Sequence, residues 1–275
     1  MTITREQITA YAEYLSAEER SAATVEKYIR NAGRFALWLG EKELTKEQVV
    51  EYKATLEGAA ATVNGVISAV NSLLAFLGKS DCRVKQLRVQ RQTYRSEDRE
   101  LTKEELYRLI RTAEGEGNDR LARAIETIAA TGIRVSELRY FTVEALRERE
   151  VIITNKGKTR TVMLTKDLTV KLRRFTKQYG IHSGPIFITR SGRSLSRTQL
   201  WAEMKALCKR AGVEETKVFP HNLRHLFAVV FYRLHKDIAK LADLLGHSSI
   251  NTTRIYLVET GKEHRRQLEA MRLVL

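Results

Sequence analysis

A histidine and an arginine lie three residues apart near the end of the chain, in the segment His221-Asn222-Leu223-Arg224. Pro220 directly precedes them, and proline is favoured at the first position of a helix. Residues three apart lie on the same face of a helix, so both side chains would lie together near a helix N-terminus, where anions are favoured. A guanidinium can bind two phosphate oxygens at once. The pair therefore indicates a phosphate site, although a capped surface helix would look the same.

A second histidine and a tyrosine follow this segment. Gly246 is suited to ending a helix, His247 comes directly after it, and Tyr256 lies nine residues further on. A phenol has a pKa of about 10, so tyrosine attacks phosphorus at neutral pH only if a neighbouring group removes its proton. His221 is of a type that could accept that proton. Taken alone, the tyrosine is equally typical of a core or surface position.

The sequence lacks the motifs of the other common kinds of phosphate chemistry. The sequence contains neither a P-loop pattern nor HExxH, and no carboxylate cluster suited to two metal ions. If the chain acts on phosphates, its side chains must stabilise the developing charge. We therefore expect no cofactor and no metal.

The elements that would position these residues are mostly helical. Thr102-x-x-Glu105 is a capping-box spacing, and further helices are expected over about 119–130 and from Pro220 onward. Two β-rich runs, 151–154 and 161–164, flank Asn155-Lys156-Gly157-Lys158 and predict a β-hairpin. The segment Thr131–Leu138 is expected to be a short turn that leads into a helix.

The first third of the chain also reads as helices. Ser16-x-x-Glu19 and Thr45-x-x-Gln48 have capping-box spacing, and apolar residues recur with helical period over about 62–77. Residues 80–100 combine six arginines and lysines with little apolar periodicity. They predict a basic linker, either along a phosphate backbone or as a solvated connector.

Charge and composition narrow the class of protein. The 275 residues carry a net charge of +15, of which residues 101–275 contribute +14. Such a surplus favours a nucleic-acid partner, with a basic surface that only aids solubility as the alternative. Cys82 and Cys208 are too few and too distant for a disulfide framework, and no apolar run approaches the length of a membrane span, about 18 residues. A reducing cytoplasm is expected, with no membrane association.

Three segments together, TGIRVSEL, HNLRH and LLGHSSINTTRIY, resemble the catalytic signature of the tyrosine recombinases, which include integrases. The resemblance covers about residue 101 to the end and extends more weakly to the N-terminal helices. It implies that Tyr256 is the nucleophile and that Glu137 is the acidic residue often found after the first arginine. It matches the remaining catalytic positions to Arg134, Lys156, His221, Arg224 and His247, with Lys158 as the alternative to Lys156.

The resemblance also implies a mainly α fold, a two-domain clamp on double-stranded DNA. Residues 1–79 would form a helical core-binding domain, 80–100 the linker, and 101–275 the catalytic domain with a small hairpin and a C-terminal tail helix. The implied activity is site-specific recombination or integration through a 3′-phosphotyrosyl intermediate and a Holliday junction, by a homotetramer. In a bacterium or archaeon the enzyme would be associated with the nucleoid. We expect no additional arm-binding domain at the N-terminus.

Two other functions remain open from the sequence. A type IB topoisomerase-like enzyme would use the same chemistry to relax supercoils as a monomer, and a non-catalytic DNA-binding protein could retain the scaffold. The tail raises a separate question. Its apolar positions Leu268, Met271 and Leu275 share one helical stripe, which predicts docking on a neighbouring protomer or folding back on its own domain.

Overall fold

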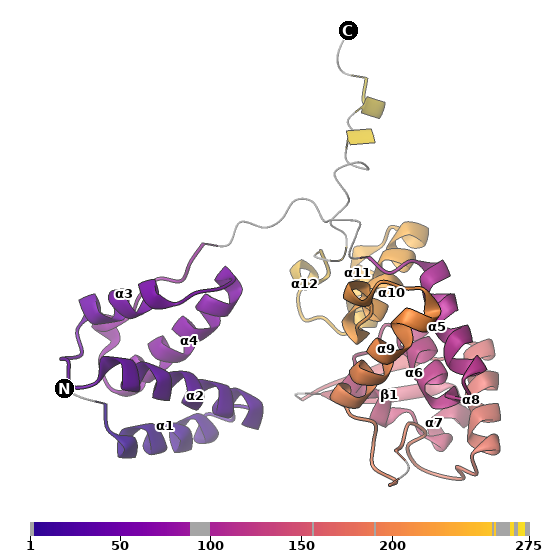
Figure 1. Cartoon of the computed structure of the whole chain (residues 1–275), viewed down its shortest axis with the longest axis horizontal. Helices are drawn as coiled ribbons and strands as arrows, with labels where there is room; N and C mark the ends of the chain where they lie inside the picture. Colours follow the sequence, from indigo (N-terminus) through magenta and orange to yellow (C-terminus); the bar gives the residue numbers. More distant parts are fainter. Residues whose placement is uncertain are drawn as a thin grey trace. The chain divides into compact units, whose positions relative to one another are not determined.

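The computed structural model describes residues 3–88, 100–155, 157–189, 191–254, 256, 265–266 and 269–272 (Figure 1). The chain divides into two compact units, Met1–Arg91 and Gln92–Leu275. The secondary structure is mainly α-helical, with one two-stranded antiparallel sheet among the described residues. The expected fold class is confirmed. Within the described residues, no helix is both long and apolar enough to cross a membrane.

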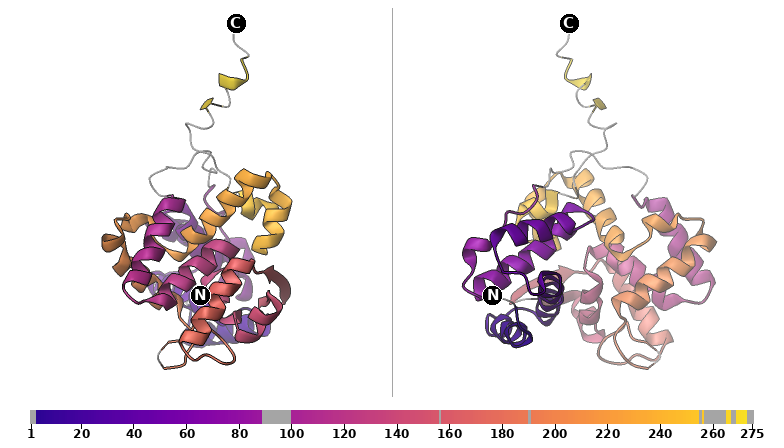
Figure 2. Two further views of the ribbon diagram at one scale, coloured as in Figure 1. Left: turned by 90° about the vertical axis from the view of Figure 1, so that its right-hand side faces the viewer. Right: turned by 60° about the vertical axis from the view of Figure 1, so that its left-hand side comes forward.

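The first unit is built from four helices and a short 3-10 turn. They are α1 (Arg5–Ala17), α2 (Ala22–Leu39), α3 (Lys46–Thr55), α4 (Ala60–Phe76) and η1 (Ser80–Cys82). The helix α2 packs against both α1 and α4 (Figure 2). Their facing sides bury Tyr11, Phe35 and Ile67 in one apolar core, because these residues recur on one side of each helix.

One expected helix start in this unit is wrong. Ser16 does not cap a helix but lies in the last turn of α1, where its hydroxyl donates to the carbonyl of Ala12. The cap of α2 is Ser21, whose side chain accepts from the amide of Thr24. Serine serves either purpose, since its hydroxyl bonds equally well to a helix carbonyl four residues back. The expected cap at Thr45 is present, because its hydroxyl accepts from the amide of Gln48.

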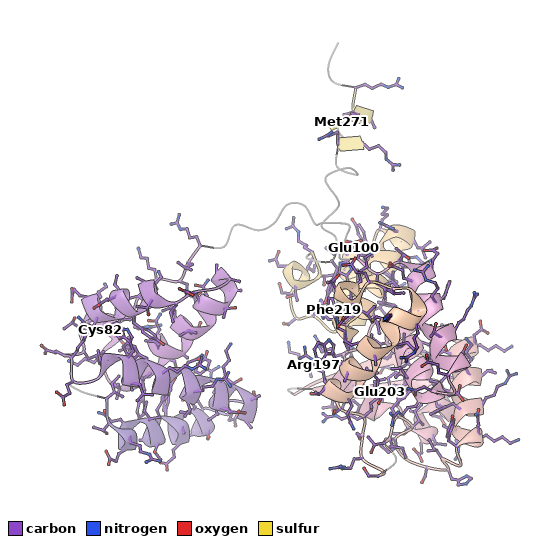
Figure 3. The ribbon with its side chains drawn as sticks, in the orientation of Figure 1. Cys82, Glu100, Arg197, Glu203, Phe219 and Met271 are labelled. Atoms are coloured by element: carbon purple, nitrogen blue, oxygen red, sulfur yellow. The ribbon has the colours of Figure 1, made fainter. Side chains whose placement is uncertain are left out.

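The segment after α4 stays attached to the first unit as far as it is described, to Arg88. The side-chain amide of Asn71 both donates to and accepts from the backbone of Val84, at 2.8 and 3.0 Å. Asn64 binds the backbone of Leu87 in the same way, at 2.9 and 2.7 Å. Cys82 is buried in the core (labelled in Figure 3). The first nine residues of the expected linker therefore line the helical unit, and residues 89–99 lie outside the described part.

The second unit contains the remaining elements. They are α5 (Lys103–Gly115), α6 (Asp119–Thr131), η3 (Val135–Tyr140), α7 (Val143–Glu148), β1 (Glu150–Asn155), β2 (Lys158–Met163), α8 (Lys166–Gln178), α9 (Arg197–Ala211), η4 (Glu215–Lys217), α10 (Pro220–His235), α11 (Ile238–Leu245) and α12 (Ile250–Arg254). The expected capping box is present at Thr102 and Glu105, and the expected hairpin is formed by β1 and β2.

The helix α6 lies at the centre of this unit and packs against α5, α8, α9 and α10 (Figures 1 and 2). It is buried on most of its surface, including Leu121, Ile125 and Ile128. It ends at Gly132, whose φ of 66° is left-handed. A Cβ at Gly132 would stand 2.4 Å from the ring of Phe227 on α10, so only glycine permits this approach. The end of α6 thereby packs directly against the middle of α10.

Candidate active site

Arg224, on the first turns of α10, is the buried centre of the candidate site. Its Nη1 donates to the carbonyl of Gly132 at 2.7 Å, and its Nη2 donates to the carbonyl of Leu245 at 2.8 Å. The side chain is 2% exposed, and burial lowers the pKa of its guanidinium, assisted by the charge of Arg134. These bonds join the turns that end α6 and α11, and they hold a cation in a place that water barely reaches.

His247 lies at the turn that follows α11. Its Nε2 is 2.8 Å from Nη2 of Arg224, and its Nδ1 is 2.9 Å from the hydroxyl of Thr253 on α12. Burial, and after it the charges of Arg224 and Arg134, lower the pKa of His247 to about 4. The imidazole is therefore neutral at physiological pH, and both of its nitrogens are engaged.

Tyr256 follows α12 and is buried among three histidines. Its phenolic oxygen is 3.4 Å from Nε2 of His221 on the first turn of α10. The rings of His247 and Tyr256 stack at 5.8 Å between centroids, with planes 7° apart, and His225 contacts the tyrosine at 5.5 Å. A histidine nitrogen stands within reach of the phenolic proton, as a general base requires.

Arg134 and Glu137 form a second cluster at η3. Glu137 is 1% exposed and accepts from the backbone amide of Arg134 at 2.6 Å and from its guanidinium at 3.1 Å. Arg160 of β2 donates to both carboxylate oxygens, at 2.9 Å each. Burial would raise the pKa of Glu137, but Arg160, the Arg134 amide and both positive charges outweigh it, so the pKa is lowered. Glu137 is thus an anion that fixes two arginines.

The two candidate lysines of the site lie on the hairpin formed by β1 and β2. Lys156 lies outside the described residues. Lys158 is described, is exposed, and pairs with Asn155 beside the turn of the hairpin. The choice between the two lysines stays a prediction. In the described part of the chain, no group of three or more His, Cys, Asp or Glu side chains could hold a metal ion.

The structure brings together Arg134, His221, Arg224, His247 and Tyr256, and it adds residues that sequence reasoning missed. Arg160 was detectable, since it shares a face of β2 with the buried Val162 and is therefore a charge pointing inward. Thr253 and His225 carried no such signal. The helix α10 begins after Phe219 (labelled in Figure 3), whose side chain does not cap it.

Comparisons with known proteins identify the family of the chain. Residues 99–263 match the phage integrase family, and residues 8–80 match the N-terminal SAM-like domain of phage integrases. Tyrosine recombinase XerA of Pyrococcus furiosus is 27% identical, over 99% of this chain and 96% of the relative. Tyrosine recombinase XerD of Rhizobium meliloti is 30% identical, over 90% of this chain and 89% of the relative.

Solved structures with the same fold include recombinases on DNA. XerH bound to its difH substrate before cleavage has a TM-score of 0.71 at 21% identity, covering 94% of this chain and 81% of that one. A lambda integrase tetramer on a Holliday junction has a TM-score of 0.72 at 18% identity, covering 91% and 76%. The matched family model and the two recombinase relatives show that the chain belongs to the phage integrase family, the tyrosine recombinases.

Proposed function

We propose that the chain is a site-specific DNA recombinase that cuts and rejoins strands through a covalent bond between Tyr256 and DNA. The observation that carries the proposal is the position of the Tyr256 phenol, 3.4 Å from His221 Nε2 and stacked on His247. A nucleophile, a base and a buried guanidinium in one place match the requirements of phosphoryl transfer.

In the proposed reaction, the phenolic oxygen attacks the scissile phosphorus while His221 accepts the phenolic proton. A bond forms between the tyrosine oxygen and phosphorus, and the bond from phosphorus to the 5′ oxygen breaks. Lys156 gives a proton to the departing 5′ oxygen. The products are a 3′-phosphotyrosine and a free 5′ hydroxyl, and attack by a 5′ hydroxyl of a partner strand reverses the step. One phosphodiester replaces another, so the reaction consumes no ATP.

The arginines would stabilise the charge that develops on the phosphate. Arg134 is held by Glu137 but remains 40% exposed, so its guanidinium can still reach a ligand. Arg224 is buried and rigidly bonded, and preorganised donors of this kind lower barriers because they need no rearrangement during the reaction. His247 would add a further hydrogen bond.

Double-stranded DNA is the proposed partner, and a homotetramer on two synapsed sites is the proposed assembly. The charge of +14 on residues 101–275 supports the first proposal. The tetrameric assembly of the lambda integrase neighbour on a Holliday junction supports the second. Residues 1–79 would serve as the core-binding domain and 101–275 as the catalytic domain. Cytoplasmic action on the nucleoid remains part of this proposal.

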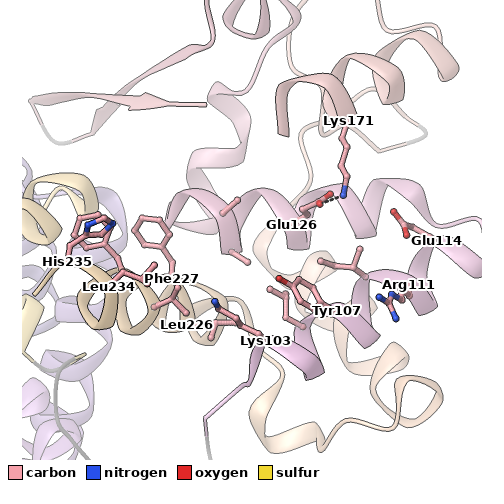
Figure 4. A pocket seen from close by; sticks show the side chains of 16 residues that line it. Lys103, Tyr107, Arg111, Glu114, Glu126, Lys171, Leu226, Phe227, Leu234 and His235 are labelled. Carbon is pink, nitrogen blue, oxygen red and sulfur yellow. Dashed lines mark hydrogen bonds and ion pairs between the residues drawn. The ribbon is translucent and has the colours of Figure 1, made fainter. Parts of the chain in front are cut away.

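A groove on the second unit offers a surface for the C-terminal stripe of a neighbouring copy (Figure 4). It lies between α5, α6 and α10, has a volume of about 610 Å³, and is lined by Leu106, Phe227 and Leu234 among others. Leu234 is 71% exposed. Of the three apolar tail positions, only Met271 is described, and it too is exposed. A tail that covers this groove in trans would couple neighbouring protomers.

The test of the proposed function has two parts. A duplex with a nick beside the cleavage site should trap a covalent protein–DNA adduct, because the short cut strand diffuses away before it can be rejoined. Strand exchange between two sites then separates a recombinase from an enzyme that only relaxes supercoils. Absence of an adduct on DNA that the protein binds specifically would contradict the proposal.

A further inference from the structure

The ring of His247 is held at both nitrogens by groups of different character. A guanidinium can only donate, so the contact of Arg224 Nη2 with Nε2 at 2.8 Å makes that nitrogen an acceptor without a proton. The single proton of a neutral imidazole must then be on Nδ1. The partner at Nδ1 is the hydroxyl of Thr253, at 2.9 Å, on a residue with no exposed surface. The threonine oxygen accepts this proton.

The charged and titratable groups around the ring all favour the neutral form. They are Arg224 and His221 from α10, Arg134 before η3, and Arg160 from β2, and Tyr256 covers one face of the ring. Positive neighbours oppose a second proton, which agrees with the pKa of about 4. A neutral imidazole can carry its one proton on either nitrogen, and the contacts with Arg224 and Thr253 select Nδ1 in the free protein.

We propose that Thr253 is a positioning residue that holds His247 in the Nδ1–H tautomer, with Nε2 directed at Arg224. The inference rests on the role proposed above for His247 at the scissile phosphate. In this tautomer Nε2 has no proton to give to a phosphate oxygen. His247 can therefore donate to a phosphate oxygen only after Nε2 takes up a proton from solvent. The Nδ1–H remains hydrogen-bonded to the Thr253 oxygen throughout.

An anionic phosphate beside the ring would favour the uptake of that second proton. Its negative charge beside the ring offsets the surrounding arginines and raises the proton affinity of Nε2. The Thr253 oxygen accepts from Nδ1–H in both protonation states and so stabilises the charged ring. Without that acceptor, the buried Nδ1–H of the imidazolium would be unsatisfied, which costs more for a charged than for a neutral group.

The tautomer is measured directly in the free, full-length protein by ¹⁵N NMR of labelled histidine, with His247→Gln to assign the signals. The wild type should show a protonated Nδ1 and an unprotonated Nε2. Thr253→Ser should retain that pattern. Thr253→Val should lose the preference for Nδ1, because a ring that Thr253 no longer holds at Nδ1 can turn Nε2 away from Arg224. Thr252→Val is the matched control, because Thr252 is the exposed neighbour on α12. A proton on Nε2 in the wild type, or an unchanged tautomer in Thr253→Val, would overturn the proposal.

The second measurement is the pH profile of adduct formation on the nicked duplex. Thr253→Val should form the adduct about tenfold more slowly, the equivalent of one lost hydrogen bond, while Thr253→Ser stays within about threefold of the wild type. The rate of Thr253→Val should also begin to fall at a lower pH as pH rises, because its imidazolium is less stable. A profile identical to the wild type contradicts the inference. If even the wild type forms no adduct, the proposed function fails, and the NMR result decides this inference by itself.

Discussion

Tyr256 and His221 meet at 3.4 Å between the phenolic oxygen and Nε2, although 35 residues separate them in the chain. The distance is long for a hydrogen bond to a hydroxyl. The general-base role proposed for His221 is compatible with it, because such contacts often tighten only when substrate is bound. The contact exists because Tyr256 packs against α10 in one apolar cluster with Leu241 and Leu245. A short displacement on DNA binding would complete it.

Removing the Tyr256 hydroxyl should abolish the covalent adduct. Tyr256→Phe keeps the buried ring and its stacking on His247, so stability should change by about 1 kcal/mol at most, the net worth of one hydrogen bond. Denaturing gels with the nicked duplex measure the adduct, and gel shifts measure DNA binding. Tyr232→Phe, on α10, is the matched control and should form the adduct normally. An adduct with Tyr256→Phe would mean that another residue attacks.

Glu137 should make stability depend on pH in the acid range. Its pKa is lowered in the folded protein, so its contribution is present above the ordinary value of 4.5 and is lost as the pH falls through the lower folded value. Glu137→Gln should flatten this dependence and cost about 3–5 kcal/mol near neutral pH, because Arg160 loses the anion that it binds in a buried place. Urea unfolding at several pH values measures both effects. Glu148→Gln, an exposed change in α7, should alter neither.

Adduct formation should not require a divalent metal. The proposed chemistry assigns charge stabilisation to Arg134, Arg224 and His247, so excess EDTA should leave the rate unchanged at moderate ionic strength. Loss of cleavage in EDTA and recovery with magnesium would contradict the mechanism. DNA binding itself should weaken steeply with salt, because contacts to phosphates release counterions. Titrations at several salt concentrations give that slope.

Deleting residues 264–275 should reduce cooperativity without preventing binding to a half-site. The tail is proposed to cover a neighbour's apolar groove, so its loss should affect only the full site and strand exchange. Leu234→Glu places a charge in the groove that would receive the tail, so it should cause the same loss of cooperativity with the tail intact. Gel-shift titrations on half and full sites compare the variants. Unchanged cooperativity in a folded truncation would instead place the tail on its own domain.

Features that depend on short stretches of sequence were predicted correctly. The capping box at Thr102 and the hairpin follow from short-range preferences, and both are present. Ser16 shows the limit, because a serine can cap the next helix or bond back within its own, and only the position of the helix end decides. The strand pattern marks Arg160 as a charge on the buried face of β2, but its pairing with Glu137, like that of His247 with Thr253, could not be derived. Arg160 is 23 residues from Glu137 in the chain, and its contact depends on how the hairpin packs.

The hydrogen bonds of Arg224 have a consequence for the resting protein. Its bonds to Gly132, Leu245 and His247 run to neutral acceptors, two carbonyls and an imidazole. In the described part of the chain, no carboxylate forms an ion pair with this desolvated cation. Burying charge in this way costs folding free energy that a well-packed apolar side chain would not. Under the proposed function, the scissile phosphate of DNA would supply the anion that this cation lacks in the free protein. Its substrate should act as a structural component that raises the melting temperature once the phosphate is in place.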